Sequence, residues 1–150
     1  MQTHYVFLDY ENAHMGNIGL IRKGVDKIKF KVFLASHHTS IPLSLVRVLQ
    51  PLGEDAEYIQ LDNGRHNAID FNIAFQLGEL AIQHPDAQFS ILSNDPGFNE
   101  IVSGLKAKGI DCARFFDMES LFKHLAVSTP AAKDESKVHK VVAIKDPRPR

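Results

Sequence analysis

The sequence predicts an α/β domain built on a parallel sheet, because short apolar runs alternate along the chain with stretches of helical periodicity. The runs are rich in β-forming residues, and they cover residues 3–9, 28–35, 56–61, 88–93 and 110–116. The first two runs lack polar–apolar alternation, which is typical of strands that are buried on both faces. Strands that alternate with helices imply right-handed β-α-β crossovers, and such crossovers make neighbouring strands parallel.

Apolar residues at three- and four-residue spacing predict the connecting helices. These helices are expected around residues 18–22, 40–53, 67–83, 96–109 and 121–125. Ser40 is expected to cap the second helix, with Pro42 in its first turn and Gly53 at its end. Pro96 is expected to open the fourth helix and Gly109 to close it.

Charge and cysteine content narrow the class of protein. The formal net charge of −1 excludes a strong basic field over the whole chain, so any contact with nucleic acid must use a local patch. The single cysteine, Cys112, excludes a disulfide within the chain and favours a reducing compartment. No apolar run approaches the ~20 residues of a membrane span, and the first residues lack a basic signal region. We therefore expect a cytoplasmic protein with no membrane partner.

The chain is long enough for one domain with its own core, and its composition places the end of that domain near Val127. From there, small and charged residues such as "STPAAKDESKVHK" replace the periodic pattern. We predict a folded domain over residues 1–126 and a flexible tail or linker over residues 127–150.

Three carboxylates occupy equivalent places at the predicted carboxyl edge of the sheet. Asp9 ends the first strand, Asp70 lies in the first turn of the helix after the third strand, and Asp95 follows the fourth strand. Like charges gathered at one edge repel each other, whereas hard Mg²⁺ or Mn²⁺ prefers carboxylate oxygens. Such an ion can activate water and stabilise charge on a phosphodiester, so these residues predict a metal site.

Each acid also has a purely structural explanation. Asp95 precedes a proline and can be a helix N-cap, and Asp70 lies three residues after Asn67, as in a variant of the capping box. Asp9 can be a turn residue at the end of its strand. Capping and metal binding are compatible, because a capping aspartate can still offer an oxygen to a cation. Their joint occurrence at one edge favours the metal site.

Three segments carry a resemblance to a known family. The segments "FLDYEN" (7–12), "HNAIDFNIAFQLGEL" (66–80) and "ILSNDPGFNEIVSGLKAKGI" (91–110) together resemble the NYN branch of the PIN-domain ribonucleases, over about residues 3–125. The resemblance implies a three-layer α/β/α sandwich around a parallel five-stranded sheet of order 3-2-1-4-5. It also implies a metal-dependent endoribonuclease that cleaves RNA with Mg²⁺ or Mn²⁺.

Carried over residue by residue, the resemblance makes Asp9, Asp70 and Asp95 the catalytic acids that bind the metal. Asn12 matches the polar partner beside the first acid, and Ser93 and Asn94 would shape the turn that presents Asp95. Candidates for additional contacts around the ion are Glu11, Asn12, Asn67, Ser93 and Asn94.

Gly97 departs from the family pattern, because related motifs usually offer a second acid two residues after the one that matches Asp95. Glu11, Glu100 and Asp117 are possible substitutes, although Asp117 is the more natural N-cap of the last helix. Three acids favour one ion over two, and a second ion can enter with substrate phosphate. The gap also supports an alternative, a catalytically weak or inactive PIN-like module that binds nucleic acid or regulates.

The substrate is expected to be RNA, in single-stranded form, and Arg65 and His66 just before the second long helix are the candidates for binding it. The eight histidines show neither HExxH nor a zinc spacing, so we expect surface or loop positions for them. The adjacent pair His37 and His38 follows the second strand at the same carboxyl edge, where it is a candidate for contact with substrate, although an exposed loop needs no such role. Basic residues between positions 22 and 31 form either a solvated face or a phosphate track. The phenylalanines fall mostly in core positions, so no platform for stacking bases is predicted.

Two other classes with acids at strand ends fit less well. A haloacid-dehalogenase phosphohydrolase needs Asp-x-Asp followed by Thr or Val, and "DYEN" does not match. A response-regulator receiver needs a lysine after its last strand, where "ARFFD" has none. The oligomeric state stays open.

Overall fold

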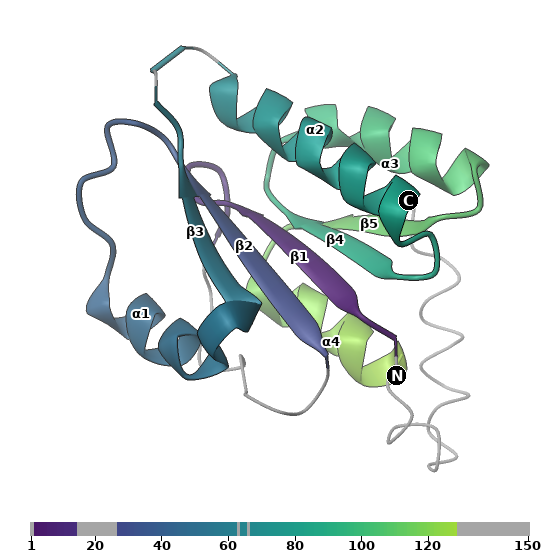
Figure 1. The fold of residues 1–150 in the computed structure, drawn as a ribbon, viewed down its shortest axis with the longest axis horizontal. Helices are drawn as coiled ribbons and strands as arrows, with labels where there is room; N and C mark the ends of the chain where they lie inside the picture. The colour runs from purple at the N-terminus through teal and green to yellow at the C-terminus, as the bar shows by residue number, and fades with distance from the viewer. Residues whose placement is uncertain (1, 15–26, 63, 66, 129–150) are drawn as a thin grey trace.

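The computed structural model describes residues 2–14, 27–62, 64–65 and 67–128. Its centre is one sheet of five parallel strands in the order β3-β2-β1-β4-β5 (Figure 1). The strands are β1 (His4–Asp9), β2 (Ile28–Leu34), β3 (Ala56–Gln60), β4 (Gln88–Leu92) and β5 (Asp111–Phe115). The predicted fold class and strand order are confirmed.

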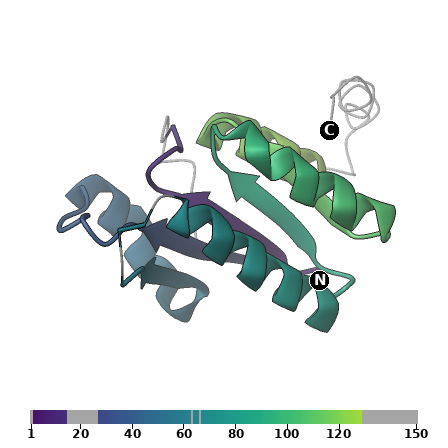
Figure 2. The ribbon, with the colours of Figure 1, turned by 90° about the horizontal axis from the view of Figure 1, so that it is seen from above.

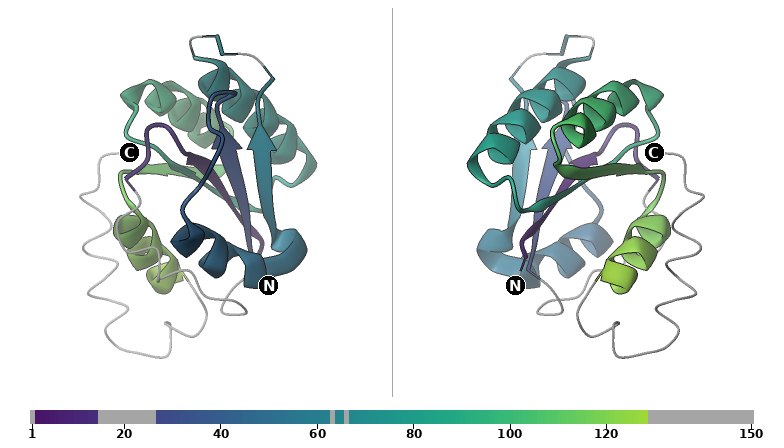
Figure 3. Two further views of the ribbon diagram at one scale, coloured as in Figure 1. Left: turned by 90° about the vertical axis from the view of Figure 1, so that its left-hand side faces the viewer. Right: turned by 90° about the vertical axis from the view of Figure 1, so that its right-hand side faces the viewer.

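Helices cover both faces of this sheet and make three layers. They are α1 (Leu43–Leu49), η2 (Gln50–Asp55), α2 (Ala68–Gln83), η3 (Pro96–Phe98), α3 (Asn99–Ala107) and α4 (Met118–Ser128). Helices α2 and α3 run over the same face (Figure 2), and α1 and α4 lie against the opposite face (Figure 3). In the described part of the chain, no helix is both long and apolar enough to cross a membrane.

The central strand explains why its sequence shows no alternation. All six residues of β1 are buried, because helices pack on both of its faces. Tyr5 and Phe7 join the core under α2 and α3, whereas Val6 and Leu8 join the core under α1 and α4. The edge strand β3 is much more exposed. A fully buried strand therefore ends in the carboxylate residue Asp9.

The capping prediction for the helix at residues 40–53 was wrong. Its first part, α1, begins at Leu43, and the N-cap is Pro42 in an extended conformation without a side-chain cap. The carbonyl of Pro42 accepts the backbone N–H of Val46, so the turn closes after the proline and Ser40 stays outside it. The second part is the 3-10 segment η2, where Gly53 adopts a positive φ of 61° and breaks the helical path.

Other predicted ends are confirmed. Asp95 caps η3 with Pro96 as the next residue, and Gly109 follows α3 with a φ of 81°. The predicted helix around residues 18–22 and most of the predicted tail, residues 129–150, lie outside the described residues.

Candidate functional site

Asp9 is held rigidly at the end of β1. Its residue is fully buried, and its carboxylate accepts three hydrogen bonds. Ser93 donates from Oγ to Oδ2 over 2.9 Å, and Asn12 donates from its backbone N–H and its side-chain amide over 3.3 and 3.2 Å. Burial raises the pKa of Asp9 although these hydrogen bonds act to lower it. The polar partners thus orient the carboxylate, whereas burial disfavours its charged form.

Asp95 is tied to the same serine. Its backbone N–H donates to Ser93 Oγ over 3.1 Å, and its own Oδ1 accepts the N–H of Gly97 over 2.9 Å. The N–H of Asn94 donates to the carbonyl of Asn12 over 2.7 Å. The loop after β4 is therefore joined to the loop after β1 at two points. A Cβ at Gly97 would lie 3.2 Å from Asp95 Oδ1, so the glycine leaves room for this tight turn.

Asp70, in the first turn of α2, lies near the other acids. Partial burial raises its pKa to about 6, with further contributions from a side-chain hydrogen bond to Asp95 and from the charges of Asp95, Asp9 and Glu11. The structure thus brings Asp70 into contact with Asp95, and both Asp9 and Glu11 lie within electrostatic reach.

The other residues predicted for the site or its surroundings have different outcomes in the structure. Asn67 precedes α2 with a left-handed φ of 65° and makes no side-chain cap, so the capping-box explanation of Asp70 was wrong. Arg65 is exposed, and its carbonyl accepts the N–H of Ala68, whereas His66 lies outside the described residues. Asp117 accepts the N–H of Ser120 over 2.9 Å, which lowers its pKa and agrees with its predicted role as a cap.

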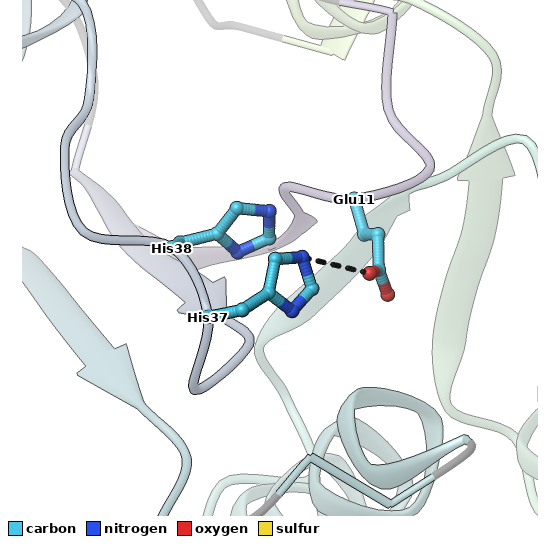
Figure 4. Close-up of side chains that lie close together, drawn as sticks. All are labelled: Glu11, His37 and His38. Carbon is cyan, nitrogen blue, oxygen red and sulfur yellow. Dashed lines mark ion pairs between the residues drawn. The ribbon is translucent and has the colours of Figure 1, made fainter.

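The histidine pair expected at this edge of the sheet forms a cluster with Glu11, and sequence reasoning did not predict that grouping. Glu11, His37 and His38 each offer a possible ligand atom, and these atoms all lie within 4.8 Å of one another (Figure 4). His37 Nε2 lies 3.5 Å from Glu11 Oε2, and the two imidazole centroids are 4.4 Å apart. Within the described residues, Asp9, Asp70 and Asp95 do not form so tight a group.

The signal for this cluster is the pairing of β1 with β2, because residues that follow two neighbouring parallel strands meet at one edge. Residue spacing alone does not reveal this pairing, but the strand order implied by the family resemblance does. The expectation that the histidines occupy surface or loop positions was wrong for His4 and His124, which are buried.

Two phenylalanines also depart from the expected core positions. Phe71, the residue after Asp70, is 71% exposed, and Phe75 one turn later is 67% exposed. Both lie on the outer side of α2, whose inner side buries Ile69, Ile73 and Leu77. An aromatic surface therefore stands next to the acidic edge.

The chain matches one family of known proteins. A family model described as the PIN domain matches residues 3–115, a range that contains all five strands and the three acids. Searches of curated proteins and of solved structures give no match.

Proposed function

This chain belongs to the PIN-domain family, and we propose that it is a metal-dependent endoribonuclease of the NYN branch. PIN domains are generally nucleases, which supports a ribonuclease-like role. The observation that carries the proposal is the contact between Asp70 and Asp95 beside the buried Asp9, at the carboxyl edge of the central strands. In parallel sheets of this kind, ligands bind at that edge.

The chemistry of this donor set fits a hard divalent cation. The acids Asp9, Asp70 and Asp95 supply oxygen ligands, with Glu11 nearby, and Mg²⁺ or Mn²⁺ prefers such oxygens. Burial, and after it the neighbouring charges of Asp95, Asp9 and Glu11, raise the pKa of Asp70, and a cation would offset the repulsion among these carboxylates. Asp9, Asp70 and Asp95 would hold the ion, which supplies activation of water and stabilisation of charge on the phosphodiester.

The other residues of the site position these acids. Ser93 and Asn12 fix both oxygens of Asp9, and Ser93 also accepts the backbone N–H of Asp95, so one hydroxyl sets the spacing of two ligands. In the proposal, Asn94 and Asn67 border the site without binding the reacting atoms.

Single-stranded RNA is the proposed substrate. The exposed rings of Phe71 and Phe75 support it, because unpaired bases stack on aromatic side chains. Arg65 and His66, just before α2, would contact the phosphates. A base-paired duplex would not present its bases to such rings.

We further propose that the protein acts in the cytoplasm, with residues 1–126 as its folded domain and residues 127–150 as a tail or linker. Cys112 supports a reducing compartment only weakly: it is fully buried, and burial raises the pKa of its thiol to about 12, so the thiol is unreactive wherever the protein resides.

Cleavage of single-stranded RNA with mapped product ends tests the function. We expect cleavage in Mn²⁺ that leaves 5′-phosphate and 3′-OH ends and stops in EDTA. Asp70→Asn should lose activity, whereas Asp86→Asn, which removes an exposed charge in the turn before β4, should keep it. Equal cleavage in EDTA, or products with 2′,3′-cyclic phosphate, would contradict the proposal.

The second candidate function is an inactive module that binds RNA, and Gly97 is the observation that favours it. An acidic residue at position 97 would crowd Asp95 Oδ1. The turn therefore lacks the fourth carboxylate that the family pattern has at this position. RNA binding by the wild type without cleavage in either Mn²⁺ or Mg²⁺ would support this candidate.

A further inference from the structure

We propose that His38 binds a phosphate oxygen of the substrate backbone through its Nε2–H, at the edge of the sheet that carries the acids. The inference deepens the proposed function, on which it rests for the identity of the ligand as RNA. It assigns His38, one member of the Glu11, His37 and His38 cluster, to an anion, although the same residue types also occur in metal sites.

A backbone hydrogen bond sets the tautomer of His38. The N–H of Ala35 donates to His38 Nδ1 over 2.9 Å. A ring nitrogen that accepts a hydrogen bond carries no proton, so the neutral ring holds its proton on Nε2. A metal ion bound at Nε2 would need that nitrogen deprotonated, and the bond from Ala35 would then have to break. The ring therefore presents a hydrogen-bond donor.

The ring is also held in place before any ligand arrives. Tyr10 packs against it edge to face, with centroids 4.9 Å apart and an interplanar angle of 88°. The backbone N–H of His38 donates to the Ala35 carbonyl, and Gln60 donates from Nε2 to the His38 carbonyl over 2.6 Å. A donor fixed in this way loses little side-chain entropy when it binds. Among the described residues, Nε2 has no hydrogen-bonded protein acceptor.

The loop that carries His38 lies at the edge proposed to bind the substrate. Phe33 of β2 pairs with Asp9, and its carbonyl accepts the N–H of Tyr10 over 3.2 Å, so the loop that carries His38 emerges beside the end of β1. The charge at this edge is otherwise negative, and carboxylates repel a phosphodiester. A neutral donor beside Glu11 offsets part of that repulsion without competing with the acids for a cation.

Affinity for a short single-stranded RNA, measured in EDTA, tests the inference without requiring cleavage. His38→Asn keeps a side-chain acceptor for the N–H of Ala35 but lacks the projecting donor, so it should weaken binding about tenfold. His38→Gln extends an amide N–H toward the position of Nε2 and should recover part of the loss. His84→Asn, at an exposed histidine after α2, is the matched control and should bind like the wild type.

The salt dependence separates this role from a purely structural one. A neutral donor releases no counterion, so His38→Asn should lower the affinity without changing the slope of log Kd against log salt concentration. Melting temperatures within a degree or two of wild type would show that the fold is intact. A less stable His38→Asn would shift the test to His38→Gln, whose affinity must then exceed that of His38→Asn.

Three results would overturn the inference, and they differ from a failure of the proposed function. Unchanged RNA affinity in His38→Asn would remove the contact. Loss of a Mn²⁺- or Zn²⁺-induced rise in melting temperature, with RNA affinity unchanged, would make His38 a metal ligand instead. A wild type that does not bind RNA would overturn both proposals, whereas one that binds without cleaving overturns the nuclease alone and leaves His38 to be decided by the variants.

Discussion

At the residue scale, Ser93 is the side chain that links the acids. It is fully buried, and its hydroxyl donates to Asp9 while accepting the backbone N–H of Asp95. A buried carboxylate that loses a donor keeps its desolvation cost without the compensating bond. Ser93 therefore contributes both to stability and to the spacing between two proposed ligands.

Ser93→Ala should destabilise the fold by ~1–3 kcal/mol, because it leaves an oxygen of Asp9 with fewer partners in a buried site. Urea unfolding monitored by circular dichroism measures this change. Ser103→Ala, on the exposed side of α3, is the control and should stay within ~0.5 kcal/mol of wild type. Equal midpoints for the two variants would show that the Ser93 hydroxyl does not support Asp9.

His4 provides a pH dependence that is separate from the proposed metal site. It is buried at the start of β1, with Nδ1 2.8 Å from Gln88 Oε1 and Nε2 2.7 Å from Ser90 Oγ. Burial lowers its pKa to about 4, against an ordinary value of 6.5, so the folded ring stays neutral where the unfolded ring takes up a proton. This stabilisation is complete above pH 6.5 and is lost as the pH falls from 6.5 to 4.

Over that pH range the wild type should lose up to about 3 kcal/mol more stability than His4→Gln, whose side chain does not titrate. Urea midpoints at half-unit pH intervals measure the difference. The acids of the site titrate in both proteins, so their contribution cancels in the comparison. Parallel pH profiles would contradict a buried neutral His4.

At the scale of the element, α2 contributes to the core, to the acidic site and to the exposed surface through different parts of one helix. Its inner side buries Ile69, Ile73 and Leu77, its first turn presents Asp70, and its outer side exposes Phe71 and Phe75. Helical periodicity predicted the inner side correctly. It missed the outer one, since an exposed phenylalanine and a buried one look alike in a sequence, and only the packing partner distinguishes them.

Phe71→Ala should weaken binding of single-stranded RNA between about fivefold and about a hundredfold, the range that corresponds to one stacked base. Fluorescence anisotropy with a labelled oligonucleotide in EDTA measures it. Ile82→Ala is the matched control, because Ile82 is 81% exposed on the same helix but lies ~16 Å further along its axis. Equal effects of the two substitutions would show that the aromatic ring is not a base-stacking surface.

The strands and helix caps show which structural features can be predicted from the sequence and which cannot. The apolar runs predicted all five strands to within about one residue at each end, because short runs of β-forming residues leave a clear pattern. The Asp95 cap was predictable because an aspartate before a proline has few other conformations. The predicted Ser40 cap was wrong because Pro42 is the N-cap and its carbonyl accepts hydrogen bonds from the first turn. The extended φ/ψ of Pro42 that allows this cannot be read from composition.

At the scale of the whole molecule, the strand order creates the site. Because β1 lies between β2 and β4, the residues that follow it meet His37 and His38 on one side and Ser93 to Asp95 on the other. The edge position of the acids and of the two histidines was predictable, whereas the approach of Glu11 to the histidines was not, since it depends on where side chains of two neighbouring loops lie. The sheet thus gathers carboxylates and imidazoles from distant segments at one edge.

The melting temperature of Asp95→Asn with and without Mn²⁺ tests the central claim, that these acids hold a divalent ion, most directly. Asparagine can keep the hydrogen bond to the Gly97 N–H, so the substitution removes charge and spares the cap. In EDTA the variant should melt at or above the wild type, because one of several repelling carboxylates is gone. Asp86→Asn is the control for the loss of one charge.

Excess Mn²⁺ should raise the melting temperature of the wild type and of Asp86→Asn, because a ligand that binds only the folded state adds RT ln(1 + [L]/Kd) to its stability. In Asp95→Asn this rise should shrink sharply. If Asp95→Asn keeps the full rise, or if the wild type shows none, the acids at this edge do not form the metal site.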